Sequence, residues 1–234
     1  TYDIRGNVQT IHDQLGRQAF EHHYDLANRT IRSRSLDAGT RLIVYDAAGN
    51  EVERRDGKGA VILREYGVLH RPTRVWARDN PHETITLREQ LIYGDGGDPN
   101  QPAERRQARQ ALNLLGKLYR HYDEAGVLSF ESYDCKGNLL EKTRRVLKDE
   151  EILSIFSTAA RDTWNVAPYR VNWQPATGGT LDHRESELLS DVSYCTSTTY
   201  DALNRITSVT YPQDVDGPDR RKVLVPHYNR AGSL

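Results

Sequence analysis

The residue types that most often carry chemistry are scattered in this sequence and do not form the spacings that such chemistry requires. Cys135 and Cys195 stand far apart, and two unpaired thiols are the simplest interpretation. His22 and His23 are adjacent, but no His-Glu-x-x-His or Cys-x-x-Cys metal pattern occurs. The Gly94–Gly97 segment lacks the Lys-Ser/Thr ending of a phosphate loop, and no nucleophile elbow marks a catalytic serine. We therefore expect no catalytic, cofactor-binding or metal-binding residue and no enzyme activity.

The aspartates, by contrast, recur in one context. Tyr-Asp occurs six times, and four copies continue as Asp-x-x-Gly: Tyr2, Asp3 and Gly6; Tyr45, Asp46 and Gly49; Tyr122, Asp123 and Gly126; Tyr133, Asp134 and Gly137. In the other two copies Asn takes the glycine position: Tyr24, Asp25 and Asn28; Tyr200, Asp201 and Asn204. Such regularity indicates an internal repeat.

Turn chemistry explains each position of this unit. The first Asp can accept a hydrogen bond from a backbone N–H two residues further on. Gly at the fourth position supplies the left-handed conformation that closes a type I turn with a bulge, and Asn is the best substitute. The Tyr ends the incoming strand, where we expect its ring to cover the turn and pack on neighbouring rings with its hydroxyl in water. These residues are therefore predicted to be structural.

Strands must lie between these turns. Turn positions fall at 3, 13, 25, 37, 46, 56 and 67, which averages about 11 residues per step, the spacing of a strand plus a turn. The apolar content is 37%, so we expect a thin core and a sheet that is solvated on one face. The predicted fold is all-β and mainly antiparallel, a strand-turn-strand sheet with two or three short helical insertions.

Composition changes divide the chain into five segments. We assign 1–93 to a repeat array, 94–117 to a loop and helix, 118–146 to repeat hairpins, 147–195 to an irregular insertion and 196–234 to a final hairpin. The helices are expected near 102–115, 149–157 and 182–190. The stretch 157–180 could cover the sheet.

Particular residues should shape these helices. In the first, Ala108, Ala111, Leu112 and Leu115 form an apolar face, and Gly116 is placed to end it. In the second, Asp149 would be the N-cap, with three side chains facing inward: Ile152, Leu153 and Phe156. In the third, Asp182 and Glu185 have the spacing of a capping box.

At the repeats the sequence resembles the RHS/YD-repeat family, and more narrowly the RHS shell of bacterial insecticidal Tc toxin complexes. The segments that carry the resemblance are 44–52, 118–126, 131–140 and 198–205. The resemblance implies a long strand that spirals into a curved or hollow β-shell around a C-terminal toxin, in a secreted or cell-surface bacterial protein. Its implied partners are the remaining shell, in the same or a partner chain, and the enclosed toxin. Family members cut themselves at an Asp-Pro-x-Gly motif, which is absent here, so no protease residue is carried over.

Charge and chain ends bear on other partners. The net charge of −1 favours no nucleic acid, and no run of 18 apolar residues suggests direct membrane insertion. Because Tyr2 and Tyr228 place both ends inside repeats, we expect a piece of a longer protein with unpaired edges prone to edge-to-edge association. The alternative is a cell-surface adhesion or carbohydrate-binding module, with Trp164 or Trp173 exposed on a glycan platform.

Overall fold

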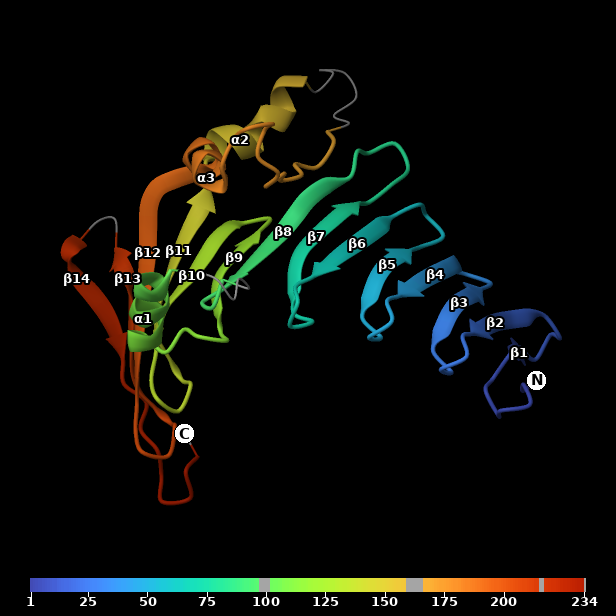
Figure 1. Ribbon diagram of the computed structural model, residues 1–234, viewed down its shortest axis with the longest axis horizontal. Coiled ribbons are helices and arrows are strands. Elements are labelled where there is room, and N and C mark those ends of the chain that lie inside the picture. The colour runs from blue at the N-terminus through green and yellow to red at the C-terminus, as the bar shows by residue number, and fades with distance from the viewer. Residues whose placement is uncertain (97–101, 159–165, 215–216, 234) are drawn as a thin grey trace. The chain divides into compact units, whose positions relative to one another are not determined.

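The computed structural model describes residues 1–96, 102–158, 166–214 and 217–233. Its strands are antiparallel wherever their register is known, and their order in the sheet follows the chain from β1 to β14 (Figure 1). Short helices interrupt the strands, so the all-β prediction with helical insertions is confirmed. The chain forms two compact units, Thr1–Arg88 and Glu89–Leu234.

The first unit is a meander of short strands. Its elements are β1 (Thr10–His12), β2 (Gln18–Tyr24), β3 (Thr30–Ser35), β4 (Gly39–Tyr45), β5 (Glu51–Arg55), β6 (Val61–Tyr66), β7 (Pro72–Arg78) and the start of β8 (Thr86–Tyr93). Exposure alternates along several strands because successive side chains point to opposite faces. Of its described apolar side chains only Val61 and Leu87 are buried, which agrees with the thin core expected from composition.

The second unit contains the remaining strands and the helices. The strands are β9 (Leu118–Asp123), β10 (Gly126–Tyr133), β11 (Leu139–Leu147), β12 (Leu189–Tyr200), β13 (Ile206–Asp214) and β14 (Gly217–Leu224). The helices are α1 (Ala103–Ala111), α2 (Asp149–Leu153), the 3-10 helix η1 (Ser154–Thr158) and α3 (Leu181–Leu188). Most of the buried apolar residues of the chain lie in this unit.

Helix α1 is shorter than predicted. It ends at Ala111 because Asn113 takes a left-handed conformation, with φ of 53°, well before Gly116. The expected apolar face is wrong, since Ala108, Ala111 and Leu112 are exposed. Leu114 is the residue that is buried, and it packs where a Cβ on Gly94 would collide with its carbonyl group.

The other two helices also depart in detail from the prediction. Lys148, not Asp149, is the N-cap of α2, and Ile152, Leu153 and Phe156 are exposed instead of facing inward. Such a short helix has no continuous apolar stripe to bury. Helix α3 is capped by the Thr180 hydroxyl, which accepts from the His183 N–H at 3.2 Å, so the expected capping box is not formed.

Candidate functional site: the Tyr-Asp turn ladder

One five-residue turn closes most of the hairpins. In the copy at 46–50, the Asp46 N–H donates to the Asn50 carbonyl at 2.9 Å, and the Gly49 N–H donates to the Asp46 carbonyl at 3.1 Å. The Asp46 carboxylate accepts from the Asn50 N–H at 2.8 Å. The same backbone pattern begins at Asp3, Asp13, Asp25, Asp56, Gly67, Asp134, Asp201 and Asn229. The fourth residue is left-handed in each, including Asn28, His70 and Asn204.

The fifth residue of the turn completes it, a role that sequence reasoning missed. The Asn50 side-chain amide donates to the second Asp46 oxygen at 2.9 Å, and Arg29 Nε donates to the second Asp25 oxygen at 2.7 Å. Equivalent bonds come from Asn7, Arg17, Asn138 and Arg205. The signal was visible in the sequence as Asn after Gly and Arg after Asn.

The Tyr122-Asp123 copy is not a turn of this kind, which corrects the prediction. Gly126 pairs directly with Asp123, so only two residues connect the strands, and its φ of 131° lies outside the left-handed helical region. Arg144 binds the Asp123 carboxylate at 2.9 and 2.5 Å. The turn at Asp37 also differs from the five-residue pattern, because the Ser35 hydroxyl accepts from the Asp37 N–H at 3.3 Å.

The tyrosines of the first unit mark every second turn. Tyr2, Tyr24, Tyr45 and Tyr66 are 22, 21 and 21 residues apart. In an antiparallel meander consecutive turns alternate between the two ends of the strands. These tyrosines therefore lie at the same end of the strands. The repeating unit is therefore a two-strand hairpin, whereas the 11-residue step is only half of it.

Turns that lie next to each other at the same end of the strands form a row, here called the turn ladder. Some neighbouring turns of this ladder are joined by side-chain amides. Asn7 Nδ2 donates to Asn28 Oδ1 at 3.0 Å, and Asn138 Nδ2 donates to Asn204 Oδ1 at 2.9 Å. The amide of Asn50 lies 3.3 Å from the ring nitrogen of His70. In each pair, a turn ending in Gly-Asn meets a turn whose fourth residue is Asn or His.

Other neighbouring turns of the ladder are joined by a cation that lies over a tyrosine ring. The Arg29 guanidinium lies 4.6 Å from the centre of the Tyr45 ring, and Arg205 lies 4.9 Å from that of Tyr228. Lys117 stands over Tyr133 at 4.6 Å. Cations thus lie between successive turns, and the expected packing on neighbouring rings also occurs, because Tyr133 stacks on Phe130 and Tyr122 packs edge-on against Trp173.

Several tyrosine hydroxyls are also bonded and are not left in water as expected. Tyr24, Tyr66 and Tyr133 donate to the carbonyls of Val8, Glu51 and Leu118, at 2.8, 3.0 and 3.3 Å. Val8 and Glu51 directly follow the fifth position of the preceding turn, whereas Leu118 is the first residue of β9. The tyrosine therefore ties two hairpins together.

Hydrogen bonding holds the turn aspartates in their charged form. The Asn50 amide lowers the pKa of Asp46 below its ordinary value, and the Arg29 N–H does the same to the pKa of Asp25. Asp3, Asp13, Asp134 and Asp201 have pKa values lowered by the same kinds of bond. All of these carboxylates prefer the folded turn when they are ionised.

The ladder should therefore weaken in acid. The pKa of these aspartates is lower in the folded state than in the unfolded state, where it is about 3.9. The ionised carboxylates therefore stabilise the fold fully above the unfolded pKa, and this stabilisation is lost as the pH falls through the folded pKa. We expect the melting temperature to fall between pH 5 and pH 2, measured by circular dichroism as a function of pH. Asn229 occupies the same position, so a chain carrying Asp25→Asn and Asp46→Asn should keep these turns and lose part of that acid dependence. Equal melting temperatures across the range would contradict the assignment.

The insertion between β11 and β12 is anchored on the sheet of the second unit. Trp173 is fully buried, donates its Nε1–H to the Asp123 carbonyl at 3.0 Å and packs edge-on against Tyr122. Glu185 of α3 accepts from the Tyr122 hydroxyl at 2.5 Å and from Arg120 at 2.9 Å. Burial, followed by the bond to Glu185, raises the pKa of Tyr122. The expectation that residues within 157–180 cover the sheet is met at Trp173, whereas the roles of Glu185 and Tyr122 were not anticipated from sequence.

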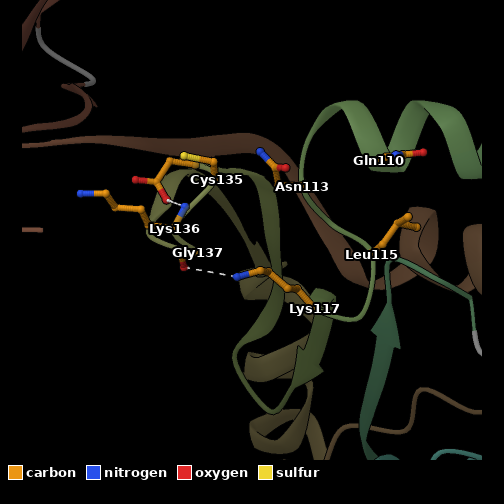
Figure 2. A pocket seen from close by; sticks show the side chains of 8 residues that line it. Gln110, Asn113, Leu115, Lys117, Cys135, Lys136 and Gly137 are labelled. Carbon is orange, nitrogen blue, oxygen red and sulfur yellow. Dashed lines mark hydrogen bonds between the residues drawn. The ribbon is translucent and has the colours of Figure 1, made fainter. Parts of the chain in front are cut away.

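A cleft of about 260 Å³ lies beside the turn at 134–138 (Figure 2). It is lined by Gln110, Asn113, Leu115, Lys117, Asp134, Cys135, Lys136 and Gly137. Lys117 Nζ donates to the Gly137 carbonyl at 3.4 Å (Figure 2). Lys136 Nζ donates to the Ala202 carbonyl at 2.5 Å. Both lysines therefore bond to backbone carbonyls of the turns at 134–138 and 201–205.

Two searches of the described residues concern other functions. No cluster of His, Cys, Asp and Glu suited to a metal ion occurs there. None of the helices in that part of the chain is long and apolar enough to cross a membrane. Trp173 is buried and therefore offers no glycan platform, whereas Trp164 lies outside the described residues.

Comparison with known proteins confirms the resemblance noted from the repeats. No family model matches the chain. Toxin subunit YenC2 of Yersinia entomophaga is 26% identical over 186 residues, which cover 70% of this chain and 18% of that protein. The crystal structure of TcdB2-TccC3 matches 100% of this chain with a TM-score of 0.71 and 24% identity, and this chain covers 11% of it. The Photorhabdus luminescens Tc holotoxin pore matches with a TM-score of 0.71 and 23% identity, over 100% of this chain and 11% of that chain. The chain thus has the fold of a segment of these toxin proteins and spans less than a fifth of their length.

Proposed function

We propose that this chain is a wall segment of an RHS-type shell in a secreted bacterial toxin complex, and that the shell encloses a C-terminal toxic effector. The observation that supports this most is the turn ladder, in which every Tyr-Asp turn except the one at Tyr122-Asp123 is bonded to the next turn by a side-chain amide or a cation. A ladder of this kind continues a sheet hairpin by hairpin. The proposed role is mechanical and not catalytic, and the proposed partners are the rest of the shell and its cargo.

The proposal gives a structural role both to the turn ladder and to the insertion between β11 and β12. The ladder sets the spacing of neighbouring hairpins at one end of the strands. The insertion anchored by Trp173 and Glu185 covers part of β9 to β11, and Glu185 bonds to β9 through Tyr122 and Arg120. A wall needs continuity and coverage, and needs no reactive centre.

Protection of a cargo tests the proposal. In TcdB2-TccC3, this chain would replace the segment that it matches, with a reporter domain carrying one protease site fused at the C-terminus. We expect the reporter to resist protease about as long as in the unaltered shell. The matched control carries Gly126→Ala in the inserted chain, which should open the wall locally and shorten that time. A well-folded chimera whose reporter is cut as fast as the free reporter would refute the wall function.

The rival adhesion function predicts a different outcome. A glycan-binding module would retain the chain on an array of immobilised glycans, whereas the wall proposal predicts no specific retention. Because Trp173 is buried between the insertion and β9, its ring is not accessible to a glycan.

A further inference from the structure

Three amide contacts join neighbouring turns of the ladder, and one of them ends on a different type of residue. In two of these joints the amide donates to the Oδ1 of an asparagine, Asn28 at 3.0 Å or Asn204 at 2.9 Å. In the third, Asn50 Nδ2 lies 3.3 Å from Nδ1 of His70, whose side chain is exposed. An amide oxygen stays unprotonated near neutral pH, whereas histidine is the side chain that ordinarily gains a charge between pH 8 and pH 5. Of the three joints, this one therefore has an acceptor that can be protonated.

The direction of the bond between Asn50 and His70 follows from the other bond of the same amide. Asn50 Nδ2 also donates to Asp46 Oδ2 at 2.9 Å. The Asn50 amide keeps the pKa of Asp46 below its ordinary value, so this carboxylate is ionised near neutral pH and can only accept. The amide nitrogen must therefore face Asp46, and its second hydrogen is the one available to His70 Nδ1. Because a ring nitrogen that accepts carries no proton, the bond requires a neutral imidazole with its proton on Nε2.

The turn at 67–71 lacks the carboxylate that stabilises its neighbours. Its first residue is Gly67, where the turns beside it in the ladder have an aspartate. The Gly67 N–H donates to the Arg71 carbonyl and the His70 N–H donates to the Gly67 carbonyl, both at 2.9 Å. His70 also has a φ of 54°, in the left-handed region that is costly for a residue with a side chain. This turn therefore depends more than its neighbours on contact with the turn beside it.

Charged groups flank the joint on both sides. Asp46 lies in the donor turn, Glu51 follows that turn, and Arg71 follows His70 in the receiving turn. Burial acts to raise the pKa of Glu51, but hydrogen bonds from two arginines bring it below its ordinary value. Both carboxylates are therefore ionised between pH 8 and pH 5, and an arginine stays charged throughout this range. Among these groups, His70 is the one that changes its charge.

We propose that His70 makes this joint of the ladder sensitive to protons. The neutral ring accepts from Asn50 and holds the hairpins β4–β5 and β6–β7 together at this end of the strands. The protonated ring is a donor at both nitrogens, so it no longer accepts and the contact opens. The bond from the Tyr66 hydroxyl to the Glu51 carbonyl, at 3.0 Å, remains, so the hairpins loosen locally without separating. The inference concerns one joint and no cargo, so it can fail while the wall function stands.

Amide hydrogen exchange at Gly49, Asn50 and His70 in the full chain tests the proposal. Rates are measured between pH 8 and pH 5, the range in which histidine titrates, and are divided by the intrinsic exchange rate at each pH to give a protection factor. We expect this factor to fall about threefold to tenfold on acidification, which corresponds to the loss of one hydrogen bond. Asn7 and Asn28, at a joint that ends on an asparagine, are the internal control and should keep their protection.

Two variants separate the joint from the turn. His70→Asn places at the fourth position the residue that serves at Asn28 and Asn204, so it should keep the protection and lose its pH dependence. Asn50→Ala removes the donor, so the protection at His70 should be low and constant across the range. The other histidines titrate equally in the parent chain and in His70→Asn, so a difference between these two chains reports on His70.

Three outcomes overturn the proposal. The first is an equal pH dependence in the parent chain and in His70→Asn, and the second is a parent chain whose protection does not change with pH. The third is protection that rises on acidification, because attraction of the imidazolium to Asp46 would then outweigh the lost bond. The cargo assay above does not depend on any of these results.

Discussion

Replacing Trp173 with alanine is expected to lower the free energy of unfolding of the second unit by about 3–5 kcal/mol. The Trp173 ring is fully buried against Tyr122, and its Nε1–H bonds the Asp123 carbonyl at 3.0 Å. The variant loses the transfer free energy of the ring and leaves a cavity between the insertion and β9. Urea unfolding followed by circular dichroism measures the change.

Trp173→Phe is the matched control. It keeps an aromatic ring against Tyr122 and removes the bond to the Asp123 carbonyl, so a smaller loss of about 1–3 kcal/mol is expected. Amide exchange should accelerate in residues 166–188 in both variants, and more in the alanine variant. If both variants unfold at the same urea concentration as the parent chain, Trp173 does not anchor the insertion.

Gly126→Ala is expected to destabilise the β10–β11 pairing by about 2–5 kcal/mol. Its φ of 131° is unfavourable for a side chain, and a Cβ there would stand 2.1 Å from the Arg145 carbonyl oxygen. Because that oxygen belongs to the backbone of a paired strand, relief requires the strands to separate. Denaturant midpoints measure the loss, and exchange at Arg145 to Leu147 locates it.

Gly6→Ala is the control for the same substitution in open space. Gly6 also has a positive φ, 84°, but a Cβ there meets nothing within 4 Å among the described residues, so only conformational strain of about 1–2 kcal/mol remains. If Gly126→Ala lowers the free energy of unfolding no more than Gly6→Ala does, the close approach to the Arg145 carbonyl contributes nothing to the loss of stability.

The turns were predictable because their determinants are local. The carboxylate of Asp46, the left-handed Gly49 and the amide of Asn50 all act within five residues. Local chemistry also misled at Asp123, where the same Tyr-Asp-x-x-Gly pattern makes a two-residue connection. There Arg144 of β11, two strands away in the sheet, binds the aspartate, and the sequence near the turn does not reveal that competitor.

The helices show the same division. Their existence followed from apolar spacing and capping signals, but α1 ends at Ala111, and Leu114 beyond it is buried because Gly94 of a neighbouring segment leaves room for it. Glu185 had the spacing of a capping residue, yet it is a buried acceptor for Tyr122 and Arg120. A charged side chain is buried only when partners reach it, and those partners lie about 60 residues away along the chain.

The sequence by itself determined that this protein is an antiparallel array closed by Tyr-Asp turns, because turn bonds span at most five residues and strand spacing follows from them. Only the tertiary structure decided that the true unit is a two-strand hairpin, and that amides and cations alternate between neighbouring turns. Those contacts join residues about 20 apart in the first unit and 66 apart between Asn138 and Asn204, so they depend on which strands become neighbours. Burial of Trp173 depends in the same way on an insertion folding back over its own sheet.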